Sequence, residues 1–141
     1  NFLMEIHKNA LDGVETNLAH LPALLDTHVH IPYAYDDVKE DIKHKSADII
    51  KEYLRLNQED FNNIEFAEKD IQIDLGDGIL INGRVDLIKK KDINGDIKTT
   101  IIDFKSAEDA QKYDVSMEQL SLYAIGYQEL SGEKADFLQV Y

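Results

Sequence analysis

Cysteine and tryptophan are both absent from the 141 residues of this chain. Without cysteine, the chain can form no disulfide, no cysteine-ligated zinc site and no cysteine-ligated iron–sulfur cluster. Protein without disulfides is typical of a reducing compartment, so we expect a cytoplasmic location. The chain also lacks any run of eighteen apolar residues, and we therefore expect no membrane-spanning segment.

Positive charge is scarce. The chain has 15 Lys and Arg against 28 Asp and Glu, which gives a formal net charge of −13. Affinity for phosphate backbones comes from Lys and Arg, so this balance argues against a free-standing DNA binder. Hydrophobic residues make up 43% of the chain, enough for a core, and the length predicts a single domain over 1–141.

Hydrophobic periodicity predicts two helices in the first part of the chain. Apolar residues recur at helical spacing over 2–11, with Gly13 as a stop, and again over about 35–56, where the outer face is strongly charged. The segment 14–33 is expected to be irregular, because Pro22 and Pro32 break regular structure.

The second part of the chain predicts a sheet and one helix. Apolar residues alternate with polar ones over 71–75 and 79–87, and a third strand is expected over about 97–104 after the Asn94-Gly95 turn. A helical period follows and ends at Ser131-Gly132, before a last strand over about 135–141. This order predicts an α/β (mixed α+β) domain with a central mixed sheet flanked by helices.

A possible reaction centre stands at the end of the third predicted strand. Asp103 and Lys105 share one strand face, because side chains alternate along a strand. Asp86 lies on the preceding strand, between apolar neighbours, where aspartate is disfavoured. Two carboxylates on paired strands are suited to a hard divalent cation. The alternative is a solvated ion pair at a sheet edge with an unrelated polar residue nearby.

Three motifs in succession resemble those of a known nuclease family. They are Gly83-Arg84-Val85-Asp86, Ile101-Ile102-Asp103-Phe104-Lys105-Ser106 and Gln119-Leu120-Ser121-Leu122-Tyr123. Together they resemble RecB-type nucleases of the PD-(D/E)XK superfamily, whose core is restriction-endonuclease-like.

The resemblance implies roles for six residues. It implies Mg²⁺ or Mn²⁺ bound by Asp86, Asp103 and the Phe104 carbonyl, with Lys105 as base or charge stabiliser. Gln119 and Tyr123, one helical turn apart, would support the site and the DNA. The implied activity is metal-dependent hydrolysis of DNA phosphodiesters in repair or recombination.

The resemblance also implies further parts of the protein. We expect a fragment of a longer helicase–nuclease protein, or a helicase subunit as partner, whose basic surface would offset the acidity here. The family often carries a metal-binding histidine on its first helix, and the expected position lies just upstream of Asn1. His7 comes too late in that helix and is interpreted as a surface residue.

Several of these residues have structural interpretations as well. Ser116 to Gln119 matches a capping box, in which Gln119 would only begin a helix, and Tyr123 would then be a core residue. Glu68, just before the strand expected at 70–75, resembles an acidic position of such domains, but a solvated charge is the preferred interpretation. The run Lys89-Lys90-Lys91 is interpreted as a solvated hairpin end, although it could also contact a phosphate backbone.

Two other functions remain open from the sequence. Asp26, His28 and His30 resemble the first metal motif of amidohydrolases, with both histidines on one strand face. That family is built on a barrel of about 250 residues, too large for this chain, and loop histidines are the simpler interpretation. The other is a non-catalytic PD-(D/E)XK scaffold that docks DNA, against which the presence of Asp86, Asp103 and Lys105 counts.

Overall fold

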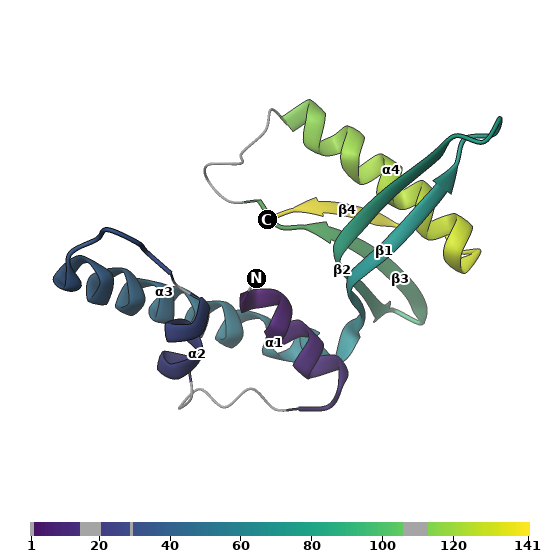
Figure 1. The fold of residues 1–141 in the computed structure, drawn as a ribbon. Coiled ribbons are helices and arrows are strands. Elements are labelled where there is room, and N and C mark those ends of the chain that lie inside the picture. Colours follow the sequence, from purple (N-terminus) through teal and green to yellow (C-terminus); the bar gives the residue numbers. More distant parts are fainter. Residues whose placement is uncertain (1, 15–20, 29, 106–112) are drawn as a thin grey trace. The chain divides into compact units, whose positions relative to one another are not determined.

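A computed structural model describes residues 2–14, 21–28, 30–105 and 113–141. Two compact units divide the chain, one up to Asn62 and one from Asn63 to Tyr141 (Figure 1). The expected single domain over 1–141 stays a prediction. Within the described ranges, no helix is both long enough and apolar enough to cross a membrane.

The first unit is helical. It contains α1 (Phe2–Leu11), α2 (Leu21–His28) and α3 (Asp36–Asn57), and α3 continues into the short 3₁₀ helix η2 (Gln58–Asn63). The sequence predicted α1 and α3 correctly. Gly13 has φ +69° and its N–H donates to the Ala10 carbonyl, so it ends α1 as expected.

Helix α2 corrects the prediction of an irregular segment over 14–33. Leu21 and Leu25 are one turn apart and both are buried, which gives the short helix an apolar face to pack. Pro22 was taken as a breaker. It is the second described residue of α2, and proline is tolerated in the first turn of a helix because its missing N–H would have no partner there.

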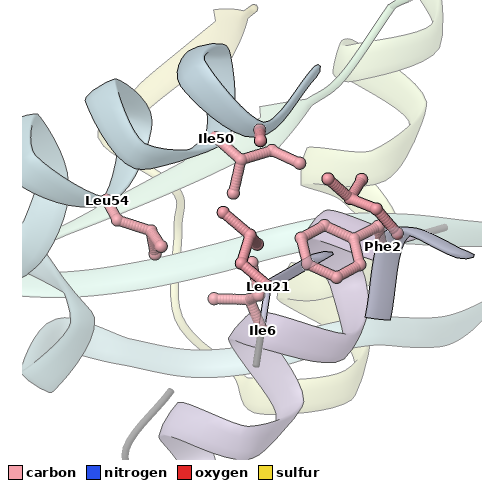
Figure 2. Close-up of a cluster of buried hydrophobic side chains, with 7 residues drawn as sticks. Phe2, Ile6, Leu21, Ile50 and Leu54 are labelled. Carbon is pink, nitrogen blue, oxygen red and sulfur yellow. The ribbon is translucent and has the colours of Figure 1, made fainter. Parts of the chain in front are cut away.

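The three helices pack around one apolar cluster. Figure 2 shows Phe2 and Ile6 of α1, Leu21 of α2, and Ile50 and Leu54 of α3 gathered in one place. The outer face of α3 instead carries i,i+3 and i,i+4 ion pairs, such as Lys45 with Asp41 and Arg55 with Glu52. The apolar side of the amphipathic pattern seen in the sequence is therefore the side of α3 that packs against α1 and α2.

His7 is not a surface residue, and that interpretation was wrong. Its side chain is fully buried in the first unit, with Nε2 2.8 Å from the Tyr53 hydroxyl and its ring edge-on to Phe61. The helical period of α1 passes through position 7 on the buried side, and the ring fills space between α1, α3 and η2 as an aromatic residue would.

The second unit is a four-stranded sheet with one helix against it (Figure 1). The strands lie side by side in sequence order: β1 (Ile64–Asp74), β2 (Leu80–Ile93), β3 (Asp96–Asp103) and β4 (Phe137–Val140). The first two pairs are antiparallel and β4 joins β3 in parallel, which confirms the predicted mixed sheet. Asn94 and Gly95 have φ of +59° and +89°, as the predicted hairpin turn requires.

Helix α4 (Tyr113–Ser131) covers one face of the sheet. Leu120 and Tyr127 are fully buried and pack with Val85, Ile88 and Ile101 from β2 and β3. Close approach is possible because residue 126 is glycine: a Cβ there would lie 2.7 Å from Cδ1 of Ile71. The core of this unit therefore lies between α4 and the central strands.

We expect Leu120→Ala to lower the free energy of unfolding by about 2–5 kcal/mol, because it opens a cavity against the sheet. Leu122→Ala is the matched control: the same substitution on the same helix, at a side chain that is 37% exposed, should change it by less than about 0.5 kcal/mol. Urea denaturation measures both. Equal effects would mean that α4 does not present this face to the sheet.

Candidate active site

Asp86 and Asp103 lie at the same end of two paired strands. Leu87 of β2 pairs with Ile102 of β3, so Asp86 and Asp103 are the next residues to face each other across the antiparallel pair. Facing residues of an antiparallel pair project from the same side of a sheet. Their charges interact accordingly, since the carboxylate of Asp103 raises the pKa of Asp86.

Asp103 is a buried acid whose charge is paired with one lysine. The residue is 3% exposed, and its Oδ2 lies 2.9 Å from Nζ of Lys105. The two charged groups are close enough to form an ion pair, but their geometry is not that of a hydrogen bond. No other described donor forms a hydrogen bond with this buried oxygen. An ionised oxygen in this position has remaining capacity to bind a cation.

Lys105 is held in place by a side chain of helix α4. Its ammonium donates to Oε1 of Gln119 at 2.8 Å, and Nε2 of Gln119 donates to the Tyr123 hydroxyl at 2.6 Å. Helix α4 begins by Tyr113, so Gln119 lies in its second turn and the capping-box interpretation was wrong. Tyr123 does pack against the core, but its hydroxyl extends the polar chain that ends on Lys105.

Asp86 is fixed by a backbone N–H just beyond the end of β3. Its Oδ2 accepts a hydrogen bond of 2.7 Å from the N–H of Phe104. Burial raises the pKa of the Asp86 carboxyl above its ordinary value. The hydrogen bond from Phe104 opposes that shift, and the charge of Asp103 adds to it. Asp86 and Asp103 thus repel each other in a partly buried place, an arrangement that a cation would relieve.

A pH-dependent stability follows from the raised pKa of Asp86. The folded protein retains a proton that the unfolded chain has lost, so the free energy of unfolding falls as pH rises through the folded pKa and then levels. We expect Asp86→Asn to be more stable than the parent at neutral pH in a chelator, because the amide oxygen can still accept from Phe104. Below the ordinary aspartate pKa the difference should disappear.

Asp136 is the control for this prediction, because its pKa is shifted in the opposite direction. The backbone N–H of Thr99 and the ammonium of Lys98 lower the pKa of Asp136, so this carboxylate stabilises the fold at neutral pH and its contribution is lost as pH falls. Asp136→Asn should therefore be less stable than the parent at pH 7. Thermal melts across pH measure both variants, and an Asp86→Asn protein less stable than the parent at pH 7 would contradict the assignment.

Glu68 lies beside Asp86, and its interpretation as a solvated charge before a strand was wrong. Strand β1 begins at Ile64, so Glu68 is inside it, between residues that pair with Leu87 and Val85. Its register position is therefore opposite Asp86, its side chain is half-buried, and its charge raises the pKa of Asp86. Its φ of +51° is unusual for a strand residue other than glycine.

The histidine motif does not form the strand site that the sequence pattern proposed. His28 is the last residue of helix α2 and pairs with Glu5 at 2.7 Å, while Asp26 pairs with Lys43. His30 is exposed, beyond the helix end. Within the described ranges, no group of three or more histidine, aspartate or glutamate side chains is arranged to hold a metal ion.

The lysine run is not a solvated hairpin end. Lys89, Lys90 and Lys91 all lie inside β2. Lys89 is buried, and Lys90 pairs with Glu65 at 3.1 Å and Glu133 at 2.6 Å. Only Lys91 is exposed. At least two of these three lysines are therefore buried or ion-paired within the protein.

Comparison with known proteins gives one match. The family model described as the PD-(D/E)XK nuclease superfamily matches residues 3–140, nearly the whole chain. No curated protein and no solved structure is significantly similar to it. The match agrees with the mixed sheet and with helix α4 packed against it, and it confirms the resemblance at the level of the superfamily. The chain belongs to the PD-(D/E)XK nuclease superfamily.

Proposed function

We propose that this chain is a divalent-metal-dependent DNA nuclease of the RecB type, acting in DNA repair or recombination with a helicase domain or subunit. The observation that carries the proposal is the position of Asp86 opposite Asp103, one step beyond the Leu87–Ile102 pair of β2 and β3, with Lys105 held beside Asp103 by Gln119. A scaffold that only docks DNA has no need of a buried and a half-buried carboxylate side by side with an oriented lysine.

The donor set fits Mg²⁺ or Mn²⁺. Both are hard cations that favour oxygen, and Mg²⁺ is commonly held by one or two carboxylates while water and substrate phosphate complete its shell. Asp86, Asp103 and the Phe104 carbonyl would hold the ion, and the buried Oδ2 of Asp103 is the best-prepared donor among them. When bound, the ion supplies charge stabilisation at the phosphate and lowers the pKa of water.

The chain's own residues would then do three things. Asp86 and Asp103 keep their oxygens fixed at the strand ends. Lys105 holds an ammonium within reach of the phosphoryl oxygens, where it stabilises developing negative charge or, once deprotonated, accepts a proton from the attacking water. Gln119 keeps Nζ at that position, because its own amide is anchored on the hydroxyl of Tyr123.

Several basic residues of the second unit are paired with acidic ones, which supports a partner whose basic surface binds the DNA. In the second unit Arg84 pairs with Asp70, Lys90 with Glu65 and Glu133, and Lys98 with Asp136. Lysines and arginines in such pairs release few counterions on meeting DNA, which limits affinity. A helicase that delivers the strand would supply the missing attraction.

Cleavage of a linear duplex and of a single strand by the purified chain tests the proposal. We expect cleavage with Mn²⁺ or Mg²⁺, none in chelator, and a loss of about 100-fold or more in Asp86→Ala, because one oxygen donor to the cation is removed. His28→Ala is the control and should cleave as the parent does. Loss on His28→Ala alone would favour the histidine motif, and binding of DNA without cleavage under any metal would favour the scaffold.

A further inference from the structure

Gly83 of β2 lies directly under the ring of Tyr123. A Cβ at position 83 would come within 3.0 Å of Cε1 of Tyr123, tighter than carbon contacts in packed proteins, whose optimum is about 3.5–4.0 Å. Its other neighbours would be Cδ1 of the same ring at 3.6 Å and Cγ1 of Ile71 at 3.7 Å, both ordinary contacts. A side chain at position 83 would therefore press on the ring of Tyr123 alone, which would have to shift by a few tenths of an ångström.

The backbone does not demand glycine at this position. Gly83 pairs with Ile71 in the β1–β2 ladder, and its φ is not in the left-handed region. Glycine inside a strand costs stability, because it is the most flexible residue in the unfolded chain and has no side chain to pack. A glycine retained at such a place marks the close approach of another group, and that group is the ring of Tyr123.

The ring cannot yield without disturbing its polar partners. Its hydroxyl accepts the 2.6 Å hydrogen bond from Gln119, whose carbonyl oxygen accepts the 2.8 Å bond from Lys105. Displacing the ring by a few tenths of an ångström moves the hydroxyl, and the amide must follow or lose that bond. The ammonium of Lys105, 2.9 Å from Asp103, is at the other end of this chain.

We propose that Gly83 is a positioning residue for Lys105, acting through Tyr123 and Gln119. This inference rests on the proposed function: Gly83 helps to position the ammonium of Lys105 beside the phosphate of the substrate. The absent side chain creates the recess, the ring fills it, and the hydroxyl at the edge of the ring sets the amide of Gln119. Gly83 touches neither substrate nor cation in this scheme.

The test is a double-mutant cycle between Gly83→Ala and Tyr123→Ala. In the parent, Gly83→Ala should lower the single-turnover cleavage rate by about 10- to 100-fold with KM little changed, as expected when a group that binds no substrate shifts a catalytic one. In the Tyr123→Ala background, where the recess is empty, Gly83→Ala should change the rate less than twofold. There it should also leave the melting temperature unchanged or raise it, because alanine restricts the unfolded chain.

A readout independent of cleavage is the NMR signal of the Gln119 side-chain amide, assigned by its loss in Gln119→Glu. Gly83→Ala should shift this signal as Tyr123→Phe does. Gly126→Ala is the matched control: its Cβ would first meet Ile71 and Ile73, so its effect on melting should be the same with and without Tyr123→Ala. The Gln119 amide should not move with it.

Additive effects of Gly83→Ala and Tyr123→Ala, or an unmoved Gln119 amide, would overturn the inference. If Gly83→Ala does not fold, the double variant decides: recovery of folding supports the inference, and failure of both overturns it. If the parent chain cleaves no DNA, the proposed function fails. The coupling of Gly83 to the Gln119 amide then still stands or falls on the NMR and melting data.

Discussion

Asp103→Asn should abolish both Mn²⁺ binding and DNA cleavage while the protein stays folded. Asp103 is the most buried acid of the site, and its Oδ2 makes no aligned hydrogen bond with any described donor. Asparagine keeps the shape and one oxygen but removes the charge that a hard cation requires. We expect Mn²⁺ affinity to fall by more than about 100-fold, and cleavage by about 10²–10³-fold, since this resembles the loss of a central electrostatic stabiliser.

The folded state should tolerate this change. Asp103→Asn removes the repulsion that raises the pKa of Asp86, and Lys105 keeps its bond to Gln119. Lys105 loses its charge partner, but its side chain is more exposed than that of Asp103, so melting in chelator should occur near the parent temperature. Titration calorimetry with Mn²⁺, and cleavage of a labelled duplex, measure the two losses.

Asp70→Asn is the matched control for Asp103→Asn. It makes the same charge change in the same unit, at an exposed acid on β1 that pairs with Arg84. It should bind Mn²⁺ and cleave as the parent does. Undiminished Mn²⁺ affinity in Asp103→Asn would place the cation elsewhere and remove the basis of the proposed function.

The parts of this site that sequence could predict are those encoded in a local period. Alternation along a strand places Asp103 and Lys105 on one face, and the i,i+4 spacing of Gln119 and Tyr123 places them on one side of a helix. The hairpin at Asn94-Gly95 then brings Asp86 opposite Asp103, because the turn determines the register. Each of these inferences needs only a few neighbouring residues.

Glu68 was misinterpreted because the first half of its strand does not look like a strand in the sequence. Strand β1 begins with Ile64, but Glu65, Glu68 and Lys69 interrupt the alternation that marked the segment from Ile71 onward. Only pairing with β2 shows that this charged stretch is a strand and that position 68 lies opposite Asp86. The signal available in the sequence was the apolar pair Ile64 and Phe66 two residues apart.

His7 and helix α2 were misjudged for a related reason. A residue type predicts burial only on average, and a histidine on the buried side of α1 becomes core when aromatic residues such as Tyr53 and Phe61 surround it. Pro22 was weighed by its general effect on helices rather than by its place in the first turn. Periodicity indicates which face of an element is buried, but not which elements will cover it.

Lys105→Met should separate cleavage from metal binding. Methionine keeps an unbranched side chain of similar length but removes the ammonium, so the phosphate loses its charge stabiliser or its base. We expect cleavage to fall by about 10²–10³-fold. Mn²⁺ affinity should stay the same or rise, because the ammonium 2.9 Å from Asp103 competes with a cation for that carboxylate.

Stability provides a second, independent measure of the same geometry. In chelator, Lys105→Met leaves the carboxylate of Asp103 buried without its paired charge, and breaking such a pair costs about 3 kcal/mol. Mn²⁺ should restore the lost charge pairing, so it should raise the melting temperature of Lys105→Met more than that of the parent. The double variant Lys105→Met/Asp103→Asn should recover stability in chelator and gain nothing from Mn²⁺.

Lys134→Met is the control, because Lys134 is an exposed lysine of the same unit. Its replacement should leave cleavage, Mn²⁺ affinity and melting near the parent values. Cleavage rates and calorimetry on the three variants, with melts in chelator and in Mn²⁺, complete the set. If Lys105→Met cleaves at the parent rate, the ammonium has no part in the reaction. If its cleavage is lost together with Mn²⁺ affinity, Lys105 acts by holding the ligands in place rather than on the phosphate. Only loss of cleavage with Mn²⁺ binding retained matches a lysine that acts at the phosphate beside a cation held by Asp86 and Asp103.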